Sequence, residues 1–282
     1  MILSKSILIT GCSSGIGRCV AEGLHARGYR VFATARRPAD VADLQSQGME
    51  SLILDLDDSV SIHAAVDEVL TRTGGTLYAL FNNAGYGQPS AVEDLRRDVI
   101  RAQFETNLFG MLELTNRIIP VMRAQGQGRI IQNSSVLGLV ALPYRGAYNA
   151  SKFAVEGLTD TLRLELINSG IHVSLIEPGP INSRFRANAH AAYQRNITPE
   201  NSVHRARYQG LEKRLTKIGP TAPFTLPPKA VLKKVIHALE SSRPKIRYYV
   251  TVPSYFFALM RRLLPGSVLD WVLQQVSKGE NR

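Results

Sequence analysis

Tyr148 and Lys152 are the residues of this sequence whose types and spacing most clearly suggest chemistry. They are four positions apart in a stretch, residues 147–166, whose pattern indicates a helix, so both side chains should project from one face. A free tyrosine has a pKa of about 10, and an ammonium about 5 Å from its hydroxyl contributes about 3 kcal/mol at an effective dielectric near 20, which lowers that pKa by roughly two. Such a tyrosine can exchange a proton with a carbonyl or alcohol oxygen near neutral pH. The competing interpretation is a tyrosine ring packed under an extended lysine, so the pair needs support from other residues.

A glycine-rich turn near the start of the chain indicates a phosphate site. An apolar stretch, residues 7–9, precedes the turn, and an apolar i, i+4 stripe of Ile16, Val20 and Leu24 follows it. Glycines between a strand and a helix permit a tight turn and a close backbone approach to a pyrophosphate, which the helix N-terminus then binds. The residues of this turn are Gly11, Cys12, Ser13, Ser14, Gly15, Ile16 and Gly17.

The elements that must position these residues alternate between strand and helix. The strands read as short segments that are apolar on both faces, which is typical of a parallel sheet covered on both sides. Alternating strands and helices predict right-handed βαβ units and an α/β, doubly wound, mostly parallel sheet. The predicted strands are residues 6–10, 30–34, 51–54, 77–82, 128–134, 171–177 and 246–252.

A set of motifs in fixed order resembles the short-chain dehydrogenase/reductase family. Beyond the glycine turn and the Tyr148/Lys152 pair, the set comprises Asn82-Asn83-Ala84-Gly85, Asn107, Ser134-Ser135 and Pro178-Gly179. The motifs cover roughly the first two-thirds of the chain. The resemblance implies a single Rossmann-type domain over residues 1–282, with a cofactor-binding and catalytic core (1–183), a helical substrate lid (184–225) and a final helix, strand and basic amphipathic tail (226–282).

The same resemblance implies roles for individual residues. Tyr148, Lys152, Ser135 and Asn107 are the expected catalytic set, in which Ser135 hydrogen-bonds the substrate oxygen, with Ser134 as the adjacent alternative, and Asn107 holds a water in a proton relay. Ser183 replaces the usual threonine of the loop that holds the nicotinamide. The expected cofactor-binding residues are Gly11, Ser13, Ser14, Gly15, Ile16, Gly17, Arg36, Arg37, Asp55, Leu56, Asn83, Ala84, Gly85, Tyr148, Lys152, Pro178, Gly179, Ile181 and Ser183.

The end of the second strand predicts which nicotinamide cofactor is used. A carboxylate there binds the ribose 2′-hydroxyl of NAD, whereas a basic residue accommodates a 2′-phosphate. Here Ala35 occupies the carboxylate position and Arg36 follows, with Arg37 as the weaker candidate. Arginine suits bidentate phosphate binding, so we predict NADP(H). The alternative is that the two arginines merely solvate a loop.

The expected substrate side is apolar. Leu139, Leu142, Pro143 and Tyr144 lie between Ser135 and Tyr148, where a loop must border the site. We expect Ser135, Leu142, Tyr144 and Tyr148 to bind an aldehyde, a ketone or a lipophilic alcohol. In the lid, Tyr193, Tyr208, Leu211 and Leu215 either line the site or belong to solvated helices.

The net charge of +11, from 34 Lys+Arg and 23 Asp+Glu, is concentrated at one end. Residues 1–202 hold 19 of each kind, while residues 203–282 hold 15 basic and 4 acidic ones. This asymmetry, together with the absence of a reading motif, argues against a nucleic-acid-binding protein. The apolar stretch of residues 255–264, with Arg261 and Arg262, and a short helix around residues 269–273 either pack on the domain or a second subunit, or lie on anionic lipid.

The remaining expectations concern cofactors, partners and location. No signal-peptide pattern and no run of about 18 apolar residues is present, so we expect a cytoplasmic protein, with a peripheral membrane contact through the tail as an option. The two cysteines and six histidines show no metal-ligand spacing, and no metal is expected. We expect a homo-oligomer, either a dimer or a tetramer.

The leading functional hypothesis is NADP(H)-dependent reduction of an apolar aldehyde or ketone. The tail resembles the hydroxysteroid- and retinol-dehydrogenase-like branch of the family, which includes bacterial NADP-dependent aldehyde reductases. A hydroxysteroid or retinol-type alcohol dehydrogenase is therefore the first alternative. A non-catalytic NADP-sensing regulatory protein is the second, and the complete set of catalytic residues counts against it.

Overall fold

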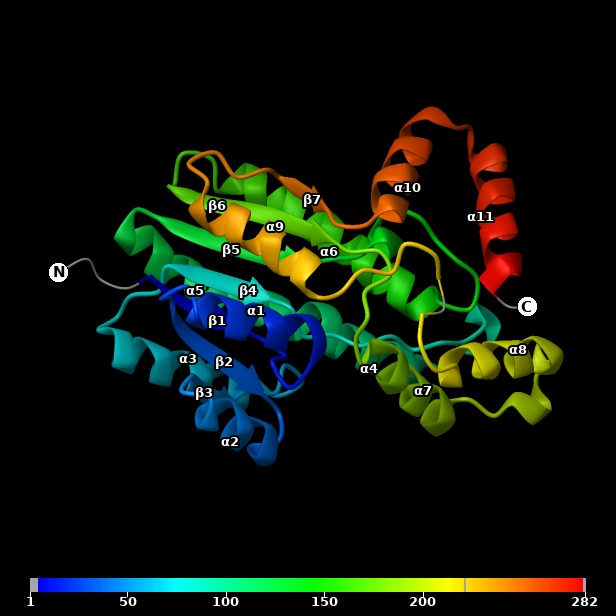
Figure 1. Ribbon diagram of the computed structural model, residues 1–282, viewed down its shortest axis with the longest axis horizontal. Coiled ribbons are helices and arrows are strands. Elements are labelled where there is room, and N and C mark those ends of the chain that lie inside the picture. The colour runs from blue at the N-terminus through cyan, green and yellow to red at the C-terminus, as the bar shows by residue number, and fades with distance from the viewer. Residues whose placement is uncertain (1–4, 221, 281–282) are drawn as a thin grey trace.

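In the part of the chain that the structure describes, seven parallel strands form one sheet in the order β3-β2-β1-β4-β5-β6-β7 (Figure 1). The structure, a computed structural model, describes residues 5–220 and 222–280. The chain runs outward from β1 to β3 and then crosses to β4 on the other side of β1. Ligands bind at such a reversal, beyond the carboxyl ends of the strands. The strands are β1 (Ser6–Ile9), β2 (Arg30–Ala35), β3 (Glu50–Ile53), β4 (Ala79–Asn82), β5 (Gly128–Asn133), β6 (Ile171–Glu177) and β7 (Arg247–Tyr249).

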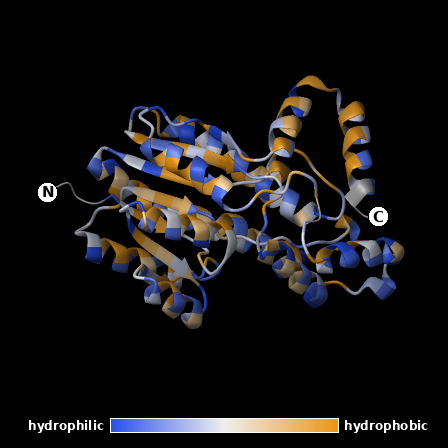
Figure 2. Cartoon of the chain, viewed as in Figure 1, coloured by the Kyte–Doolittle hydropathy of each residue, from blue (hydrophilic) through white to orange (hydrophobic). Residues whose placement is uncertain are grey.

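Helices cover both faces of this sheet, so the predicted doubly wound α/β fold is confirmed. Ile7 and Ile9 of β1 pack with α1, α2 and α9, whereas Leu8 faces α3, α5 and α6. In Figure 2 the strands are mostly hydrophobic, while the helices carry hydrophilic residues as well. The helices are α1 (Gly15–His25), α2 (Pro38–Ser46), α3 (Ser59–Thr73), α4 (Arg97–Phe104), α5 (Gly110–Gln125), α6 (Gly146–Glu165), α7 (Phe185–Asn196), α8 (Arg205–Thr216), α9 (Lys229–Glu240), α10 (Val252–Leu263) and α11 (Gly266–Glu280).

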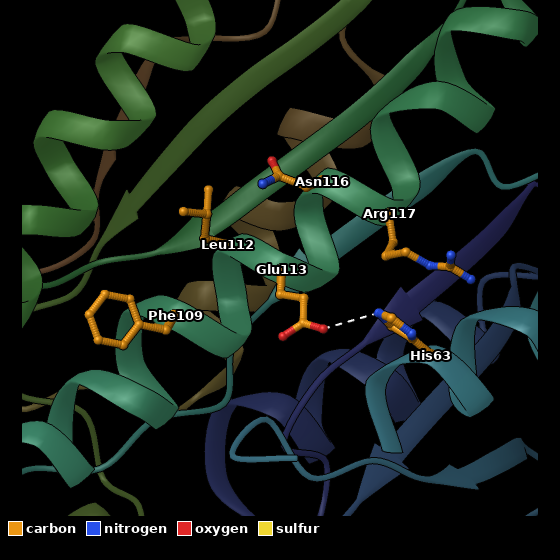
Figure 3. Close-up of a pocket in the computed structure, with 6 residues that line it drawn as sticks. All are labelled: His63, Phe109, Leu112, Glu113, Asn116 and Arg117. Atoms are coloured by element: carbon orange, nitrogen blue, oxygen red, sulfur yellow. Dashed lines mark ion pairs between the residues drawn. The ribbon is translucent and has the colours of Figure 1, made fainter. Parts of the chain in front are cut away.

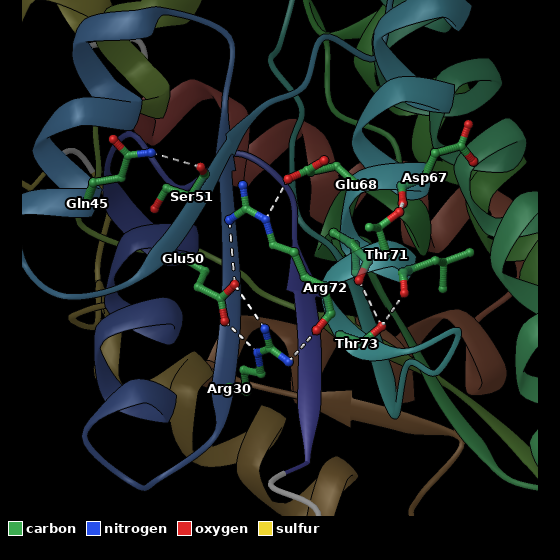
Figure 4. Close-up of polar contacts among 11 residues, drawn as sticks. Arg30, Gln45, Glu50, Ser51, Asp67, Glu68, Thr71, Arg72 and Thr73 are labelled. Atoms are coloured by element: carbon green, nitrogen blue, oxygen red, sulfur yellow. Dashed lines mark hydrogen bonds and ion pairs between the residues drawn. The ribbon is translucent and has the colours of Figure 1, made fainter.

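Ionic contacts fix the amino-terminal end of the sheet edge (Figure 4). Arg30, the first residue of β2, donates to Glu50 of β3 at 2.5 Å and to the carbonyl of Arg72 at 2.8 Å. Arg72 in turn pairs with Glu68 at 2.7 Å and with Glu50 at 3.5 Å. These contacts tie β2, β3 and α3 together at the end of the sheet opposite the carboxyl ends of the strands.

The lid and the tail differ from expectation in detail. Tyr193 and Tyr208 are neither solvated nor shown to line the site: they belong to a small core in which α7 and α8 pack on Ala91, and are 2% and 1% exposed. Leu211 and Leu215 belong to the same cluster. The short helix expected around residues 269–273 is the 15-residue α11, which makes a hairpin with α10. No helix in residues 5–220 and 222–280 has the length and apolar character needed to cross a membrane.

Candidate active site

The glycine-rich turn between β1 and α1 is closed by contacts that leave no room for side chains. Gly11 has a φ of +72°, and a Cβ there would lie 2.8 Å from the Cα of Ala84. At Gly17 a Cβ would lie 2.2 Å from the carbonyl oxygen of Gly11. Both positions therefore require glycine, because the turn, the first helix and the end of β4 approach one another too closely for any side chain.

Asn83 locks this turn to the carboxyl ends of the neighbouring strands. Its amide nitrogen donates to the carbonyls of Thr10 at 2.9 Å and Gly11 at 3.2 Å, while its backbone N–H donates to the Thr10 hydroxyl at 2.9 Å. The Thr10 hydroxyl also accepts from the backbone N–H of Ala84 at 2.9 Å. Asn133, the last residue of β5, donates to the Asn83 side-chain oxygen at 3.0 Å. The predicted Asn83-Ala84-Gly85 segment thus lies against the turn.

The start of α1 fits a diphosphate. Ser14 is the N-cap residue, and its side chain makes no capping hydrogen bond to the first turn of the helix. The leading N–H groups of α1 therefore have no acceptor from this residue, and they carry the positive end of the helix dipole. The loop after β6 faces the same place, since a Cβ on Gly15 would come within 2.9 Å of the Ser183 Cβ. A narrow cradle of backbone donors is the arrangement that a dinucleotide pyrophosphate requires.

The two arginines predicted at the adenosine end differ in their surroundings. Ala35 ends β2 and is buried, and Arg36 beside it is exposed. Arg37 is held by Asp40 through two hydrogen bonds of 2.7 and 2.8 Å, so a cofactor phosphate would have to compete with this ion pair. Asp55 follows β3 and accepts from the backbone N–H of Asp57 at 3.1 Å, and Leu56 beside it is buried.

Tyr148 and Lys152 lie one turn apart near the beginning of α6, with the Lys152 Nζ 5.7 Å from the centre of the tyrosine ring. Nζ donates to the carbonyl of Asn133 at 2.7 Å. Burial lowers the pKa of Lys152 to about 8, and the negative charge of Glu156 partly opposes this lowering. Burial also raises the pKa of Tyr148 to about 12, while a hydrogen bond with the Ser135 side chain lowers it. Burial thus dominates, and the pKa of Tyr148 lies above its ordinary value rather than below it, as the sequence suggested.

Ser135 is placed by the short turn that follows β5. It is the N-cap of the 3-10 turn Val136–Gly138, and its hydroxyl oxygen accepts from the backbone N–H of Leu137 at 3.1 Å. The same side chain hydrogen-bonds Tyr148. Ser134, the adjacent alternative, is buried next to Gly138, where a Cβ would lie 2.7 Å from its hydroxyl oxygen. Of the two serines, Ser135 is the one in contact with the tyrosine hydroxyl.

Asn107 lies in a π-helical turn, Glu105–Phe109, between α4 and α5. Hydrophobic periodicity in the sequence gives no sign of this wider turn. The Asn107 oxygen accepts from the backbone N–H of Tyr86 at 3.1 Å, and its nitrogen donates to the Tyr86 carbonyl at 3.0 Å and the Ser151 hydroxyl at 3.1 Å. A Cβ on Gly85 would lie 3.0 Å from the Asn107 oxygen and 3.8 Å from the Lys152 Nζ, so the three residues meet at one point. π-Turns often occur at functional sites.

Phe185, the first residue of α7, is a site residue that sequence reasoning missed. Its ring packs edge-on against Tyr148, with 5.2 Å between ring centres. A Cβ on Gly87 would lie only 2.9 Å from the edge of this ring. The available signal was its position two residues after Ser183, whose hydroxyl accepts from the Phe185 backbone N–H at 3.3 Å. The loop before it is tied down where Ile181 pairs with Leu226 in a β-bridge.

Tyr144 and Leu142, the predicted substrate residues of the loop before α6, face different neighbours. Tyr144 has a φ of +61°, and its hydroxyl hydrogen-bonds the Nδ1 of His204, a lid residue that the sequence did not single out. The Tyr144 carbonyl accepts from the backbone N–H of Ser90 at 3.0 Å. Leu142 packs against the cluster that joins Val140 to the α10–α11 hairpin, so its contact with substrate stays a prediction.

Two surface pockets lie apart from this constellation. One is formed by α3, the π-turn and α5, where His63 pairs with Glu113 at 3.1 Å (Figure 3). The other shares Phe109 with the first and extends along α4. None of the predicted cofactor, catalytic or substrate residues lines either pocket. Their lining residues are His63, Phe109, Leu112, Glu113, Asn116 and Arg117 in the first, and Ile100, Arg101, Phe104, Glu105 and Phe109 in the second.

Comparison with known proteins agrees with this geometry. The profile of the family described as short chain dehydrogenase matches residues 5–194. The uncharacterized oxidoreductase YbbO of Escherichia coli K12 is 44% identical, over 97% of this chain and 95% of that protein. The NADPH-dependent 3-dehydrocapnine reductase of Ornithobacterium rhinotracheale is 31% identical, over 93% of this chain and 94% of that protein.

A human relative and a solved structure extend the comparison. The 17-beta-hydroxysteroid dehydrogenase type 1 of Homo sapiens is 33% identical, over 92% of this chain and 80% of that protein. A crystal structure of a short-chain dehydrogenase from Streptomyces avermitilis superposes with a TM-score of 0.78 at 30% identity, covering 98% of this chain and 96% of that one. The chain therefore belongs to the short-chain dehydrogenase family, in its hydroxysteroid- and retinol-dehydrogenase-like branch, and is an oxidoreductase acting on alcohol or carbonyl groups.

Proposed function

We propose that this protein is an NADPH-dependent reductase of apolar aldehydes and ketones. The observation that carries the choice of cofactor is Arg36, an exposed arginine that follows Ala35 at the end of β2, where NAD-binding proteins of this fold place a carboxylate. The NADPH-dependent 3-dehydrocapnine reductase among the relatives supports this choice. Arg36 would hold the 2′-phosphate, and the start of α1 would hold the diphosphate.

The reaction is a hydride transfer to the carbonyl carbon, coupled to protonation of its oxygen. A nicotinamide cofactor bound there would supply the hydride. Tyr148 donates its hydroxyl proton to the carbonyl oxygen, and Ser135, which touches the same hydroxyl, stabilises the charge that develops there. Lys152 keeps a positive charge beside the phenolate that results. Asn107 orients the segment around Tyr86 and Ser151 next to the lysine.

The protonation states suit the reductive direction. With a pKa of about 12, Tyr148 carries its proton at neutral pH and is ready to donate it. Lys152, with a pKa of about 8, is still mostly charged at pH 7. The proton donor and the cation that stabilises its conjugate base are therefore both in place before the substrate binds.

The apolar substrate class rests on the residues around Tyr148. The Phe185 ring lies against the tyrosine, and the loop that contains Leu139, Leu142 and Pro143 runs from Ser135 toward it. Apolar and aromatic walls with a few convergent polar groups are typical of sites for apolar ligands. The hydroxysteroid dehydrogenase among the relatives makes a steroid alcohol or ketone the second candidate.

A screen of cofactor consumption tests the proposal. NADPH oxidation is followed at 340 nm with aliphatic and aromatic aldehydes, ketones, steroids and retinal, and with NADH as the control. We expect turnover with apolar carbonyl compounds and a higher kcat/KM with NADPH than with NADH. Preference for steroids or retinal would move the assignment to the second candidate. Tight NADPH binding without turnover on any carbonyl would support a cofactor-sensing protein.

A further inference from the structure

The α10–α11 hairpin has one face that packs on the body of the protein. Phe257 of α10 and Leu273 of α11 are buried with Val140, which lies in the loop after Ser135. Arg261 belongs to this inner face: it donates to the carbonyl of Leu139 at 2.6 Å, and its guanidinium lies 5.0 Å from the centre of the Phe153 ring. The hairpin is thus anchored, and it stands at the edge of the molecule in Figure 1.

The opposite face of α10 exposes a regular apolar stripe. Val252, Phe256, Leu259 and Leu263 follow one another at intervals of four, three and four residues, which places them along one side of the helix. Each is between 45% and 65% exposed. On α11, Val268 and Trp271 are also exposed, the latter by 62%. We call these six residues the outer stripe; both helices show hydrophobic colouring in Figure 2.

Positive charge accompanies the outer stripe. Arg262 precedes Leu263. Burial raises the pKa of the nearby Tyr249, and the positive charge of Arg262 partly opposes this rise. Lys234 of α9 donates to the hydroxyl of Tyr255 at 3.4 Å. The hairpin, residues 252–280, contains three basic side chains and two acidic ones, Asp270 and Glu280. The stripe also lies in the segment 203–282, which has 15 basic and 4 acidic residues and so carries the whole positive surplus of the chain.

An amphipathic helix with exposed Phe, Leu and Trp and neighbouring Lys and Arg has the composition of a helix that lies at a membrane surface. The apolar side chains enter the boundary between headgroups and acyl chains, and the cations meet lipid phosphates. A second copy of the chain fits this face less well. A two-fold interface would bring each patch, including Arg262 and Lys234, against its own copy, so like charges would face one another.

We propose that the outer stripe is a docking surface for an anionic phospholipid bilayer. The hairpin binds the membrane in its plane, without crossing it. Its inner face remains on the loop of residues 136–142, so docking brings the substrate side of the protein close to the lipid. This inference does not depend on which carbonyl compound the enzyme reduces, and it is tested without any assay of turnover.

The only tryptophan of the chain, Trp271, reports on this surface directly. The full-length protein is mixed with vesicles of phosphatidylcholine alone, or of phosphatidylcholine with phosphatidylglycerol. We expect the Trp271 emission to shift to shorter wavelength, and brominated lipids to quench it, with the anionic vesicles only. Cosedimentation should show the same preference, and it should weaken at high salt because the cations are screened.

Variants locate the binding to the stripe. Leu259→Glu combined with Leu263→Glu is expected to reduce the vesicle-bound fraction at limiting lipid by at least about tenfold, since each leucine loses its apolar burial and gains a repelled charge. Ile218→Glu is the matched control: it changes an apolar residue that is 97% exposed outside the stripe, and it should bind like the parent. If the double variant does not fold, Arg262→Glu tests the same surface, because it changes only an exposed side chain beside the stripe.

Several outcomes would overturn the proposal. These are no emission shift with anionic vesicles, equal binding to neutral and anionic vesicles, and equal losses in the stripe and control variants. An emission shift that grows with protein concentration in the absence of lipid, together with a doubled mass in light scattering, would assign the stripe to a second copy instead.

Discussion

At the scale of single residues, the proposed chemistry depends on how strongly Tyr148 and Lys152 are withdrawn from water. Burial raises the pKa of the tyrosine to about 12 and lowers that of the lysine to about 8, so both groups are pushed toward their neutral forms. The carboxylate of Glu156, four residues beyond Lys152 on α6, partly offsets this for the lysine. A protonated tyrosine beside a charged lysine is the state suited to donating a proton.

Tyr148→Phe removes the donated proton but keeps the ring and its packing against Phe185. We expect kcat to fall by at least about 10² to 10⁴, the usual contribution of a general acid. The dissociation constant of NADPH should stay close to that of the parent. Steady-state kinetics and a fluorescence titration of NADPH measure the two quantities, and retained turnover would remove Tyr148 from the mechanism.

The pH dependence of the reaction should follow Lys152. Its pKa of about 8 means that the ammonium, and with it the stabilisation of the phenolate, is lost as the pH rises through that value. We expect kcat for carbonyl reduction to decline above pH 8. Glu156→Gln removes the charge that raises the lysine pKa, so the decline should begin at lower pH. An unchanged alkaline limb in this variant would contradict the assignment.

Cofactor preference should depend on Arg36 much more than on Arg37. Arg36→Ala is expected to raise the KM for NADPH by about tenfold or more, and that for NADH only slightly, because a charge-assisted contact to the 2′-phosphate is lost. Arg37→Ala is the matched control, since Asp40 already binds that guanidinium. Equal effects of Arg36→Ala on the two cofactors would exclude a role in choosing between them.

At the scale of elements, a buried ionic cluster joins α6, β6 and β7. Arg247 of β7 donates to Glu177 of β6 at 2.6 Å and to Asp160 of α6 at 2.5 Å, and it also pairs with Glu156. Glu177 is fully buried, and desolvation together with the neighbouring Glu156 raises its pKa to about 8 in spite of Arg247. One arginine thus has to compensate two buried carboxylates, Glu156 and Glu177, in addition to the more exposed Asp160.

This cluster predicts a stability that falls as the pH rises. The folded protein binds the Glu177 proton more tightly than the unfolded chain, whose pKa is near 4.5, so the free energy of unfolding should decrease between about pH 4.5 and pH 8. Glu177→Gln should weaken that dependence by more than about 1 kcal/mol across the interval. Urea unfolding at pH 5 and pH 8 measures it.

The control is Glu50→Gln, because Arg30 lowers the pKa of Glu50 and its pH dependence therefore lies below this interval. If the free energy of unfolding fell equally with pH in the Glu177 variant and in the parent, Glu177 would be ionised across the whole interval.

Much of this fold was predictable from the sequence because the strands are buried on both faces. β6 spans residues 171–177 as predicted, and the other strand boundaries lie within about two residues of the prediction, apart from the shorter seventh strand. The packing of the lid was harder to predict from the sequence, because Tyr193 and Tyr208 belong to a core that depends on how α7 and α8 pack together. Local patterns do not specify such long-range packing.

The candidate site, too, was predictable only in part. The motifs placed Tyr148, Lys152, Ser135 and Asn107 in one region, and the structure brings all four together. Phe185 and His204 were not found, because each acts through a contact across a large sequence separation that no spacing rule encodes. The Arg36 contact, the three-part division of the chain and the roles of the individual catalytic, cofactor and substrate residues stay predictions.

At the scale of the whole molecule, we propose that the protein is a homo-oligomer. Phe109 is 47% exposed and is shared by the two pockets on the α3–α5 side, where Leu112 adds a second apolar group. Phe109→Glu should shift the mass measured by light scattering toward the monomer, whereas Trp271→Glu on the hairpin should not. A monomeric parent protein, or an unaffected Phe109 variant, would refute this arrangement.

The π-turn at Glu105–Phe109 also determines how far α5 is rotated about the helix axis relative to α4. A π-turn holds one residue more than an α-turn, and one residue of an α-helix corresponds to a rotation of about 100°. Gln103 before the widened turn and Asn107 within it both donate to the Tyr86 carbonyl, at 2.8 and 3.0 Å. Deleting a single residue here would let α4 and α5 join as one regular helix and would rotate one amide away from the other. The extra residue thus acts as a spacer. Insertions and deletions within residues 105–109 should therefore be tolerated far less than substitutions at the exposed positions of this turn.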